Sequence, residues 1–247
     1  MEPVRILRSE GVEPVVFYAN SNIHPAEEYA RRLATLREWA ADADLEVVEG
    51  AYDPEAWETT AGRIGNAAEA KFGVITNEEG ALEGDASPAR AAREARCRAC
   101  YRLRFEEAAR YAREHGYSAL GTTLSVSPYQ YTRIIREELQ RACAREDIEA
   151  RFADYRPFYD EATRRSREGG MYRQNYCGCR FSDAEAAAER EERRAARRAA
   201  REAELAAHAD ERAAAEAERA RTRAEKQAYA DKQAKKRAIL KALREQQ

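Results

Sequence analysis

Roughly the last quarter of the chain cannot form a hydrophobic core of its own. Residues 183–247 hold 17 Lys and Arg and 14 Asp and Glu among many alanines. The larger apolar residues there are almost confined to Leu205, Tyr229, Ile239, Leu240 and Leu243. Such a segment buries too little surface to offset its conformational entropy. The sequence therefore predicts a globular domain over residues 1–182 and a long, largely solvated helix over residues 183–247, held by ion pairs between successive turns.

The two parts carry opposite net charge. The chain has 43 basic and 45 acidic residues, and the front part holds 26 and 31 of them, so it is net −5 and the back part is net +3. A mildly acidic domain argues against a large basic nucleic-acid face, so an RNA partner would need a local patch. No apolar run approaches the roughly 18 residues of a membrane span, and no charged-then-apolar leader opens the sequence. We therefore expect a cytoplasmic protein with no membrane partner.

Short β-branched and aromatic runs alternate with helical patterns in the front part. The pattern predicts strands at 15–18, 45–49, 118–122 and 148–152, and helices at about 25–43, 100–116 and 129–145. This order favours an α/β fold with a mostly parallel sheet.

Two stretches of the front part do not follow this alternation. Pro3–Arg8 is typical of the end of a helix with no strand before it, although doubly wound sheets usually start with a strand. We therefore expect the fold to lack its first strand. The Phe72–Ile75 run is compatible with a short strand, and Asn77–Asp85 predicts an exposed insertion.

Four of the five cysteines occur as two close pairs. Cys97 and Cys100 form a CxxC just ahead of a predicted helix, and Cys177 and Cys179 form a CxC. Cys143 stands alone on a predicted helix and is expected to be a small buried apolar residue. Close pairs in a chain without an export signal are typical of redox chemistry or metal binding in a reducing compartment.

The CxxC spacing favours a shared metal or cluster. At a helix start, both thiolates can face one ion, and the helix dipole together with Arg96, Arg98 and Arg102 would stabilise them. A zinc ion or an iron–sulfur cluster needs about four ligands. The alternatives are a thioredoxin-like dithiol and two incidental buried cysteines.

The CxC spacing favours electron transfer. A disulfide between Cys177 and Cys179 would close a small ring, and Gly178 would relieve the backbone strain of that ring. Such a bond departs from relaxed geometry and is comparatively easy to reduce. The alternative is that both sulfurs are further ligands of the metal held by the CxxC.

Polar loops follow two of the predicted strands. Thr122–Tyr129 lies between a strand end and a helix start, where N–H groups and hydroxyls bind anions or ribose, although an ordinary hydroxyl-rich loop is an equal alternative. His24 occupies a similar position. The candidates for binding substrate are His24, Thr123, Ser125, Tyr129 and Arg156, and the candidates for protonating a leaving oxygen are Asp154, Arg156, Tyr129 and His24.

Five motifs together closely resemble the cobalamin-independent epoxyqueuosine reductases, the QueH family. In chain order they are Asn20–Tyr29, Glu49–Asp53 with Trp57, Arg96–Tyr101, Thr122–Tyr129 and Tyr172–Cys179. The resemblance covers about residues 2–182, the last motif is very specific, and the tail has no counterpart in it.

This resemblance implies a fold, an activity and a cofactor. The fold is an adenine-nucleotide-hydrolase-type (Rossmann-like) α/β domain with a [4Fe-4S] cluster, and the reaction converts epoxyqueuosine at the tRNA wobble position to queuosine. The family's CxxC cluster ligands correspond to Cys97 and Cys100, and its redox-active disulfide corresponds to Cys177 and Cys179. A dithiol and a cluster near a flexible base suit an epoxide deoxygenation that needs two electrons. The electron donor is not identified by the sequence.

The sequence departs from the family at its front end. The family's other two cluster ligands are adjacent cysteines at the end of the first strand, and that segment is absent here. We expect a start placed downstream of the natural one, or a truncation with an inactive or rewired site. Two rival functions remain, namely a zinc-containing RNA-binding protein without catalysis and a cluster-free thiol oxidoreductase that uses Cys177 and Cys179.

Overall fold

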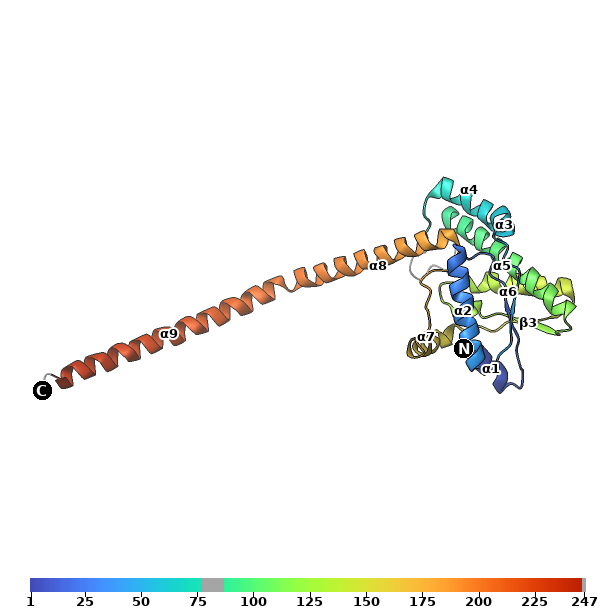
Figure 1. The fold of residues 1–247 in the computed structure, drawn as a ribbon. Coiled ribbons are helices and arrows are strands. Elements are labelled where there is room, and N and C mark those ends of the chain that lie inside the picture. Colours follow the sequence, from blue (N-terminus) through green and yellow to red (C-terminus); the bar gives the residue numbers. More distant parts are fainter. Residues whose placement is uncertain (77–86, 246–247) are drawn as a thin grey trace. The chain divides into compact units, whose positions relative to one another are not determined.

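The computed structural model describes residues 1–76 and 87–245 (Figure 1). The insertion predicted at Asn77–Asp85 lies outside the described residues. The chain divides into two compact units, residues 1–190 and 191–247. Across the described ranges, every helix is too short or too polar to cross a membrane.

The first unit is an α/β domain that contains all four predicted strands. They are β1 (Val16–Tyr18), β2 (Val47–Glu49), β3 (Ala119–Gly121) and β4 (Glu149–Arg151). β1 pairs in parallel with β2, and β3 pairs in parallel with β4. The two pairs form separate sheets where one continuous sheet was predicted. Each strand has only three residues and makes few ladder bonds, so the surrounding helices supply most of the packing.

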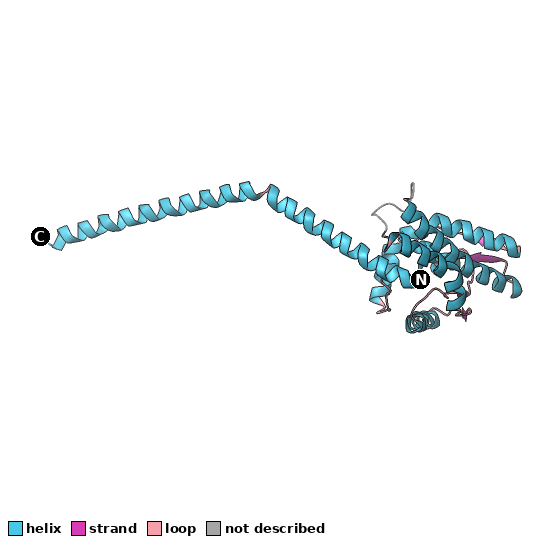
Figure 2. Ribbon diagram, turned by 90° about the horizontal axis from the view of Figure 1, so that it is seen from above, coloured by secondary structure: helices cyan, strands magenta, loops and turns pink. Residues whose placement is uncertain are grey.

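Helices account for most of the first unit (Figure 2). They are α1 (Glu2–Ser9), α2 (Ala26–Asp42), α3 (Pro54–Trp57), α4 (Arg63–Phe72), α5 (Pro88–Glu114), α6 (Thr132–Glu146) and α7 (Tyr159–Glu168), with short turns at Glu58–Gly62, Leu124–Val126 and Arg156–Phe158. α1 confirms the helix predicted at the front. The short strand suggested by Phe72–Ile75 is wrong, because Phe72 ends α4 and Gly73 follows it with a φ of +71°, a left-handed conformation that stops the helix without starting a strand.

The helix predicted to start at Cys100 starts twelve residues earlier, at Pro88. The Ser87 side chain accepts a hydrogen bond from the Arg90 N–H at 3.2 Å, and Pro88 occupies the first turn, as suits an N-terminus. The Ala- and Arg-rich first turns carry few large apolar residues, so their helical period is weak in the sequence. The CxxC therefore lies inside α5, beyond the reach of the dipole at the helix start.

The main hydrophobic core lies between α5 and α6. It contains Tyr101, Phe105, Ile134, Ile135 and Leu139, all at most 5% exposed. Cys143 belongs to the same cluster and is 1% exposed, which confirms its prediction as a small buried residue. Partly buried Cys97 packs against the edge of this core, so α5 connects the core to the CxxC.

A buried carboxylate of α6 pairs with two of the three arginines that were predicted to stabilise the thiolates. Glu138 is 1% exposed and accepts hydrogen bonds from Arg98 Nη1 at 2.8 Å and from Arg102 Nε at 2.9 Å. That prediction is wrong for Arg98 and Arg102, because the CxxC lies in the middle of a helix packed on α6 and both side chains reach across to this carboxylate. Burial by itself raises the pKa of Glu138, but the two guanidinium groups outweigh it and hold the pKa below the ordinary 4.5.

The lowered pKa of Glu138 predicts an acid-sensitive link between α5 and α6. A carboxylate whose pKa is lower in the folded state stabilises the fold fully above pH 4.5 and loses that effect as the pH falls through the lowered value. We expect Glu138→Gln to reduce the free energy of unfolding by about 1–3 kcal/mol near pH 7. Urea titrations across the acidic range should show the difference from wild type shrinking toward zero. A difference that stays constant with pH would contradict this account.

The second unit continues the helical tail. α8 (Arg180–Ala207) starts within the first unit, and α9 (Ala209–Glu245) follows after His208. The one long helix predicted for residues 183–247 is therefore two helices, and Figure 2 shows the break between them. Beside the break, the Arg212 guanidinium donates a hydrogen bond to the Leu205 carbonyl. It thereby competes with the backbone N–H groups of the helix for this acceptor. Almost all described side chains of residues 191–238 are exposed, as their composition predicts.

Candidate functional site: four thiols between α5 and the start of α8

The two cysteine pairs, about 80 residues apart in sequence, come together in the first unit. Cys97 and Cys100 lie on α5, and Cys177 and Cys179 lie on the turn that leads into α8. Cys100 and Cys179 share one buried apolar cluster with Trp57, Ala61 and Phe181. The charges of Cys177 and Cys179 also act to raise the pKa of both Cys97 and Cys100. All of these cysteines are free thiols in the structure.

Burial keeps the CxxC thiols protonated. It raises the pKa of Cys97 to about 12, against the opposing charge of Arg96. It also raises the pKa of Cys100 to about 12, against Arg104. The thiolates were predicted to be stabilised by a helix start, and that prediction is wrong because the pair lies in the middle of α5, with Cys100 buried and Cys97 partly buried. A bound cation is therefore what would ionise these thiols.

The CxC turn is held by Arg32 of α2. Its Nη1 donates to the Cys177 carbonyl at 2.9 Å, and its Nη2 donates to the Tyr176 carbonyl at 3.3 Å. Its Nε donates to Glu28 at 2.7 Å. The Arg32 guanidinium lies 4.9 Å from the ring centroid of Tyr176, and that of the neighbouring Arg31 lies 4.7 Å from the ring centroid of Tyr172. Arg32 is 8% exposed, so these contacts are made away from water. They fix the backbone on both sides of Cys177.

Gly178 is required by the shape of this turn. Its φ is +125°, a conformation that L side chains rarely adopt. A Cβ there would lie 2.9 Å from Ile23 Cγ1 and 3.0 Å from Arg32 Nη1. The glycine between the two cysteines therefore serves the close approach of the turn to α2 and its preceding loop, as well as the backbone of the pair.

We expect Arg32→Ala to loosen the CxC turn. The substitution removes the hydrogen-bond donor of the Tyr176 and Cys177 carbonyls and one of the partners of Glu28. The free energy of unfolding should therefore fall by about 2–4 kcal/mol, and turnover should fall by about tenfold. Chemical denaturation and rate measurement check this expectation. Arg37→Ala is the matched control, because Arg37 lies on the same helix with a side chain that is 55% exposed. Equal effects of the two substitutions would contradict a specific role for Arg32.

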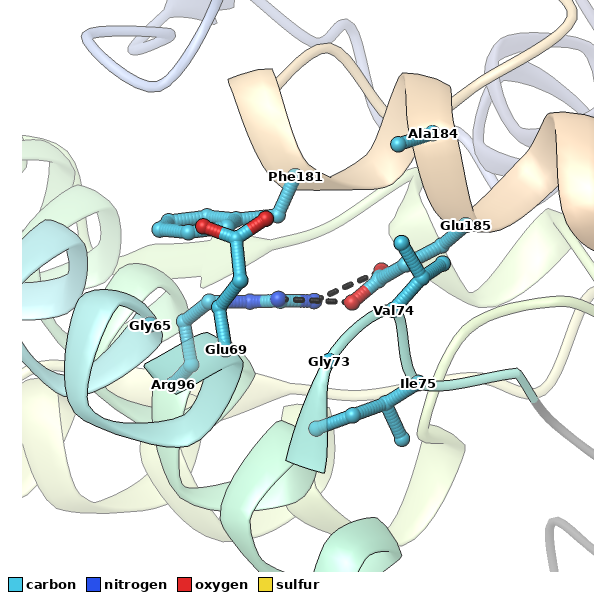
Figure 3. A pocket seen from close by; sticks show the side chains of 9 residues that line it. All are labelled: Gly65, Glu69, Gly73, Val74, Ile75, Arg96, Phe181, Ala184 and Glu185. Carbon is cyan, nitrogen blue, oxygen red and sulfur yellow. Dashed lines mark hydrogen bonds and ion pairs between the residues drawn. The ribbon is translucent and has the colours of Figure 1, made fainter. Parts of the chain in front are cut away.

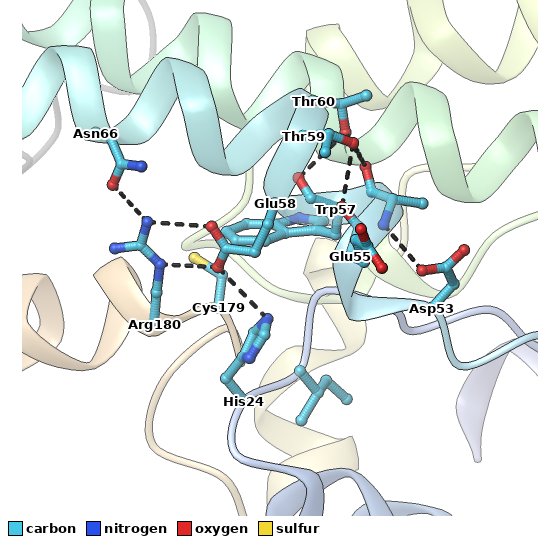
Figure 4. A network of polar contacts seen from close by, with 12 residues as sticks. His24, Asp53, Glu55, Trp57, Glu58, Thr59, Thr60, Asn66, Cys179 and Arg180 are labelled. Carbon is cyan, nitrogen blue, oxygen red and sulfur yellow. Dashed lines mark hydrogen bonds and ion pairs between the residues drawn. The ribbon is translucent and has the colours of Figure 1, made fainter.

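His24 lies against the same turn, as Figure 4 shows. The backbone N–H of His24 donates to the Gly178 carbonyl at 2.9 Å, and the backbone carbonyl of His24 accepts a hydrogen bond from Tyr176 Oη at 3.0 Å. Its Nε2 is 3.9 Å from Glu58 Oε1, and Glu58 also accepts from Arg180 Nε at 2.8 Å. Burial lowers the pKa of His24. The negative charge of Glu58 acts to raise this pKa, and the positive charge of Arg180 lowers it further. The imidazole is therefore neutral near pH 7.

Buried polar atoms without partners surround the thiols in the described part of the chain. They belong to Trp57, Asn22 and Arg96, of which only Arg96 was predicted to act on the thiols, whereas Trp57 and Asn22 were predicted only as parts of motifs. Trp57 is fully buried, its ring lies 5.5 Å from that of His24, and its indole N–H makes no hydrogen bond of normal geometry to the described residues although it lowers the pKa of Cys100. Asn22 is 1% exposed, and within residues 1–76 and 87–245 both of its amide atoms are unpaired, as is Arg96 Nε. Buried polar atoms without partners are rare and mark places where a ligand can bind.

A buried ion pair joins the two cysteine segments (Figure 3). Arg96, next to Cys97, donates from Nη1 and Nη2 to the two carboxylate oxygens of Glu185 on α8, at 2.7 and 2.8 Å. Arg93 Nε also lies 3.2 Å from Glu185. The sequence placed Glu185 in the solvated tail, and this is wrong because α8 is buried on α5 at its first turns. Phe181 and Arg96 leave a cavity of only about 10 Å³ beside them, room for one water at most.

The remaining predicted binding residues lie elsewhere, at the carboxyl ends of β3 and β4. Ser125 is fully buried and donates to the Ala153 carbonyl at 2.7 Å, so it ties the two loops together. Thr123 is exposed, Tyr129 is 60% exposed, and Arg156 pairs with Asp154 at 2.6 Å. The structure thus brings His24 to the thiols and groups the other four residues at the second sheet.

The order of these features along the chain matches a known family. The sequence model described as "Epoxyqueuosine reductase QueH" matches residues 1–72 and 81–185, which include both cysteine pairs, Arg32, Trp57 and Glu185. The chain belongs to the epoxyqueuosine reductase QueH family.

Several curated QueH proteins resemble this member of the family. The one from Dehalococcoides mccartyi is 27% identical over 179 residues, which cover 72% of this chain and 83% of that protein. The Staphylococcus aureus protein is 27% identical over 68% of this chain and 64% of its own length. The Helicobacter pylori protein is 31% identical over 70% of this chain and 42% of its own. All three are named epoxyqueuosine reductase QueH, an oxidoreductase, and the chain spans slightly under two thirds of the staphylococcal one.

The iron–sulfur cluster implied for QueH members fits the site in kind but not in number. Thiols and unpaired N–H donors are the groups that bind such a cluster and hydrogen-bond to its sulfurs. Within residues 1–76 and 87–245, however, no three His, Cys, Asp or Glu side chains are placed to hold a metal ion together. Cys97 and Cys100 amount to two of the about four ligands that such a cluster needs.

Proposed function

We propose that this chain reduces epoxyqueuosine to queuosine in tRNA, the last step of queuosine biosynthesis. The observation that carries the proposal is that one cysteine of the CxxC pair, Cys100, and one of the CxC pair, Cys179, share a buried cluster in a chain that belongs to the QueH family. The names of the relatives state the same activity for those proteins. The Rossmann-like type inferred from the resemblance is compatible with the two parallel strand pairs.

The redox chemistry falls to Cys177 and Cys179. Each thiol loses its hydrogen and one S–S bond forms, which releases two electrons and two protons. The epoxide takes them up, both of its C–O bonds break, a C=C bond forms and the oxygen leaves as water. The disulfide is then reduced by an external thiol or one-electron donor that the chain does not identify. Arg32 holds the carbonyls next to the pair, so the two sulfurs keep their positions while the bond forms and breaks.

The surroundings of the pair exclude water and position the proton carriers. Trp57 and Phe181 cover the Cys179 side of the cluster. Among the predicted proton donors, His24 is the one that contacts the CxC turn, whereas Asp154 has its pKa lowered by Arg156 and is held ionised. We therefore assign proton transfer to His24, whose neutral imidazole would take up a proton released by the thiols and pass it to the leaving oxygen, with Glu58 beside its Nε2.

Cys97 and Cys100 would provide two ligands of a [4Fe-4S] cluster. When bound, such a cluster would supply one-electron transfer. Anaerobic reconstitution with iron and sulfide tests this assignment. Cys97→Ser and Cys100→Ser should each lose bound iron and visible charge-transfer absorbance, and Cys143→Ser should not. Mass spectrometry of nucleosides from treated tRNA should show queuosine replacing epoxyqueuosine, and no conversion by reconstituted protein would contradict the proposed activity.

The same measurements decide between this function and its rivals. Zinc in place of iron in anaerobically purified protein would favour a non-catalytic RNA-binding protein. Dithiol exchange at Cys177 and Cys179 that survives Cys97→Ser and Cys100→Ser, without any epoxide reduction, would favour a cluster-free thiol oxidoreductase.

A further inference from the structure

A groove of about 570 Å³ runs along α7. It is lined by Tyr159, Asp160, Thr163, Arg164, Arg167 and Glu168 of this helix and by Arg173 of the segment after it. Its size falls within the range of ligand-binding clefts. α7 is labelled in Figure 1.

Two arginines of the groove have no carboxylate partner in the part of the chain that the structure describes. Arg164 is occupied, since it pairs with Glu161 at 2.7 Å and with Glu168 at 2.6 Å. Arg167 and Arg173 are exposed, and neither makes an ion pair or a side-chain hydrogen bond within the described chain. Asp160, in the first turn of α7, is the lining carboxylate without a basic partner among the described residues. An anion would therefore bind at the Arg167–Arg173 end of the groove and avoid the Asp160 end.

The other end of the groove is aromatic. Tyr159 meets Tyr129 edge to face, with ring centroids 6.0 Å apart and an interplanar angle of 81°. Tyr129 is 60% exposed, which is unusual for an aromatic ring in a folded domain. Tyr159 and Arg167 are two turns apart on α7, about 12 Å along its axis. Exposed rings next to basic side chains are the combination that binds unpaired nucleotides, because bases stack on the rings and phosphates pair with the arginines.

The groove is linked to the CxC turn by side chains. Arg173 follows Tyr172, whose hydroxyl donates to Glu28 at 2.9 Å. Glu28 is also the partner of Arg32, which holds the carbonyls of Tyr176 and Cys177. A ligand in the groove would therefore lie against the segment that leads directly to the reactive cysteines.

We propose that this groove binds the single-stranded RNA loop that carries the reacting base, with bases stacked on Tyr129 and Tyr159 and the backbone phosphates held by Arg167 and Arg173. The inference rests on the proposed function and adds to it the surface that recognises the substrate. The acidic net charge of the whole domain agrees with a local patch, because it leaves no broad basic face to take this role.

Fluorescence anisotropy with a labelled anticodon stem–loop RNA tests the groove without any turnover. The double variant Arg167→Ala with Arg173→Ala should weaken binding about tenfold and lower the slope of log Kd against log salt by about 1.4, the effect of two lost phosphate contacts to single-stranded RNA. The double variant Tyr129→Ala with Tyr159→Ala should weaken binding at least fivefold and leave the salt slope unchanged, since stacking releases no counterions. Arg113→Ala, an exposed arginine of α5, is the matched control and should not change the affinity.

Two comparisons separate this groove from other RNA-binding or anion-binding surfaces. Arg193→Ala with Arg197→Ala and Arg201→Ala removes exposed or half-exposed charge from α8, and a loss of affinity in this variant alone would overturn the groove. Poly-glutamate that competes as well as RNA would overturn recognition of a nucleic acid. In turnover assays the groove variants should raise KM with kcat little changed. Normal RNA binding by a wild-type protein that reduces no epoxide would refute the proposed function and leave the groove supported.

Discussion

Serine in place of Cys177 or Cys179 is expected to lower the rate of epoxide reduction by about 10³-fold or more, because one sulfur alone cannot deliver two electrons by forming an intramolecular disulfide. The two cysteines lie on a turn held by Arg32 and the bulk of the domain packs elsewhere, so the fold should survive the change. Conversion of epoxyqueuosine to queuosine in tRNA, followed by nucleoside mass spectrometry, measures the effect.

Cys143→Ala is the control for this prediction. Cys143 is also buried, but it lies in the core between α5 and α6, apart from the cluster that holds Cys100 and Cys179. Its substitution should cost some stability and leave the specific activity of folded protein near that of wild type. If Cys177→Ser and Cys143→Ala lost activity equally, a redox role for the CxC pair would be refuted.

Removal of Glu185 should destabilise the first unit strongly, although the sequence composition of residues 183–247 places Glu185 at the start of the charged tail. Its carboxylate is 4% exposed and takes both terminal nitrogens of Arg96, which is 3% exposed, so Glu185→Ala leaves a buried guanidinium group without its partner. Loss of one member of such a pair costs about 3–5 kcal/mol. Urea denaturation followed by tryptophan fluorescence reports on the correct unit, because Trp39 and Trp57 both lie within residues 1–190.

Two further variants show whether buried charge is the cause. Glu168→Ala breaks a pair with Arg164 whose side chains are 60% and 55% exposed, and it should change the free energy of unfolding by less than about 1 kcal/mol. Glu185→Leu combined with Arg96→Met removes both charges and should recover most of the loss caused by Glu185→Ala. A double variant no more stable than Glu185→Ala would show that packing of α8, and not the unpaired charge, is the cause.

Local sequence patterns predicted the secondary structure best where a strong signal exists. Val16–Tyr18 and Val47–Glu49 lie in short runs rich in β-branched or aromatic residues, and both are strands. The start of α5 was missed because the alanines and arginines after Pro88 carry no apolar period, and only the Ser87 cap marked it. The break at His208 was missed for the same reason, since nothing in the local composition distinguishes it from its flanking helices.

The sequence alone determined the cysteine spacing, the family and the absence of a core in the tail, because these depend on residue types and their local order. The tertiary structure decided which residues act on the thiols. Arg98 and Arg102 turn toward Glu138, and Arg96 pairs with Glu185 across 89 residues of chain. Such partners are chosen by the packing of α5 against α6 and α8. The desolvation that raises the pKa of Cys97 and Cys100 also arises only when distant segments meet and exclude water from the space between them.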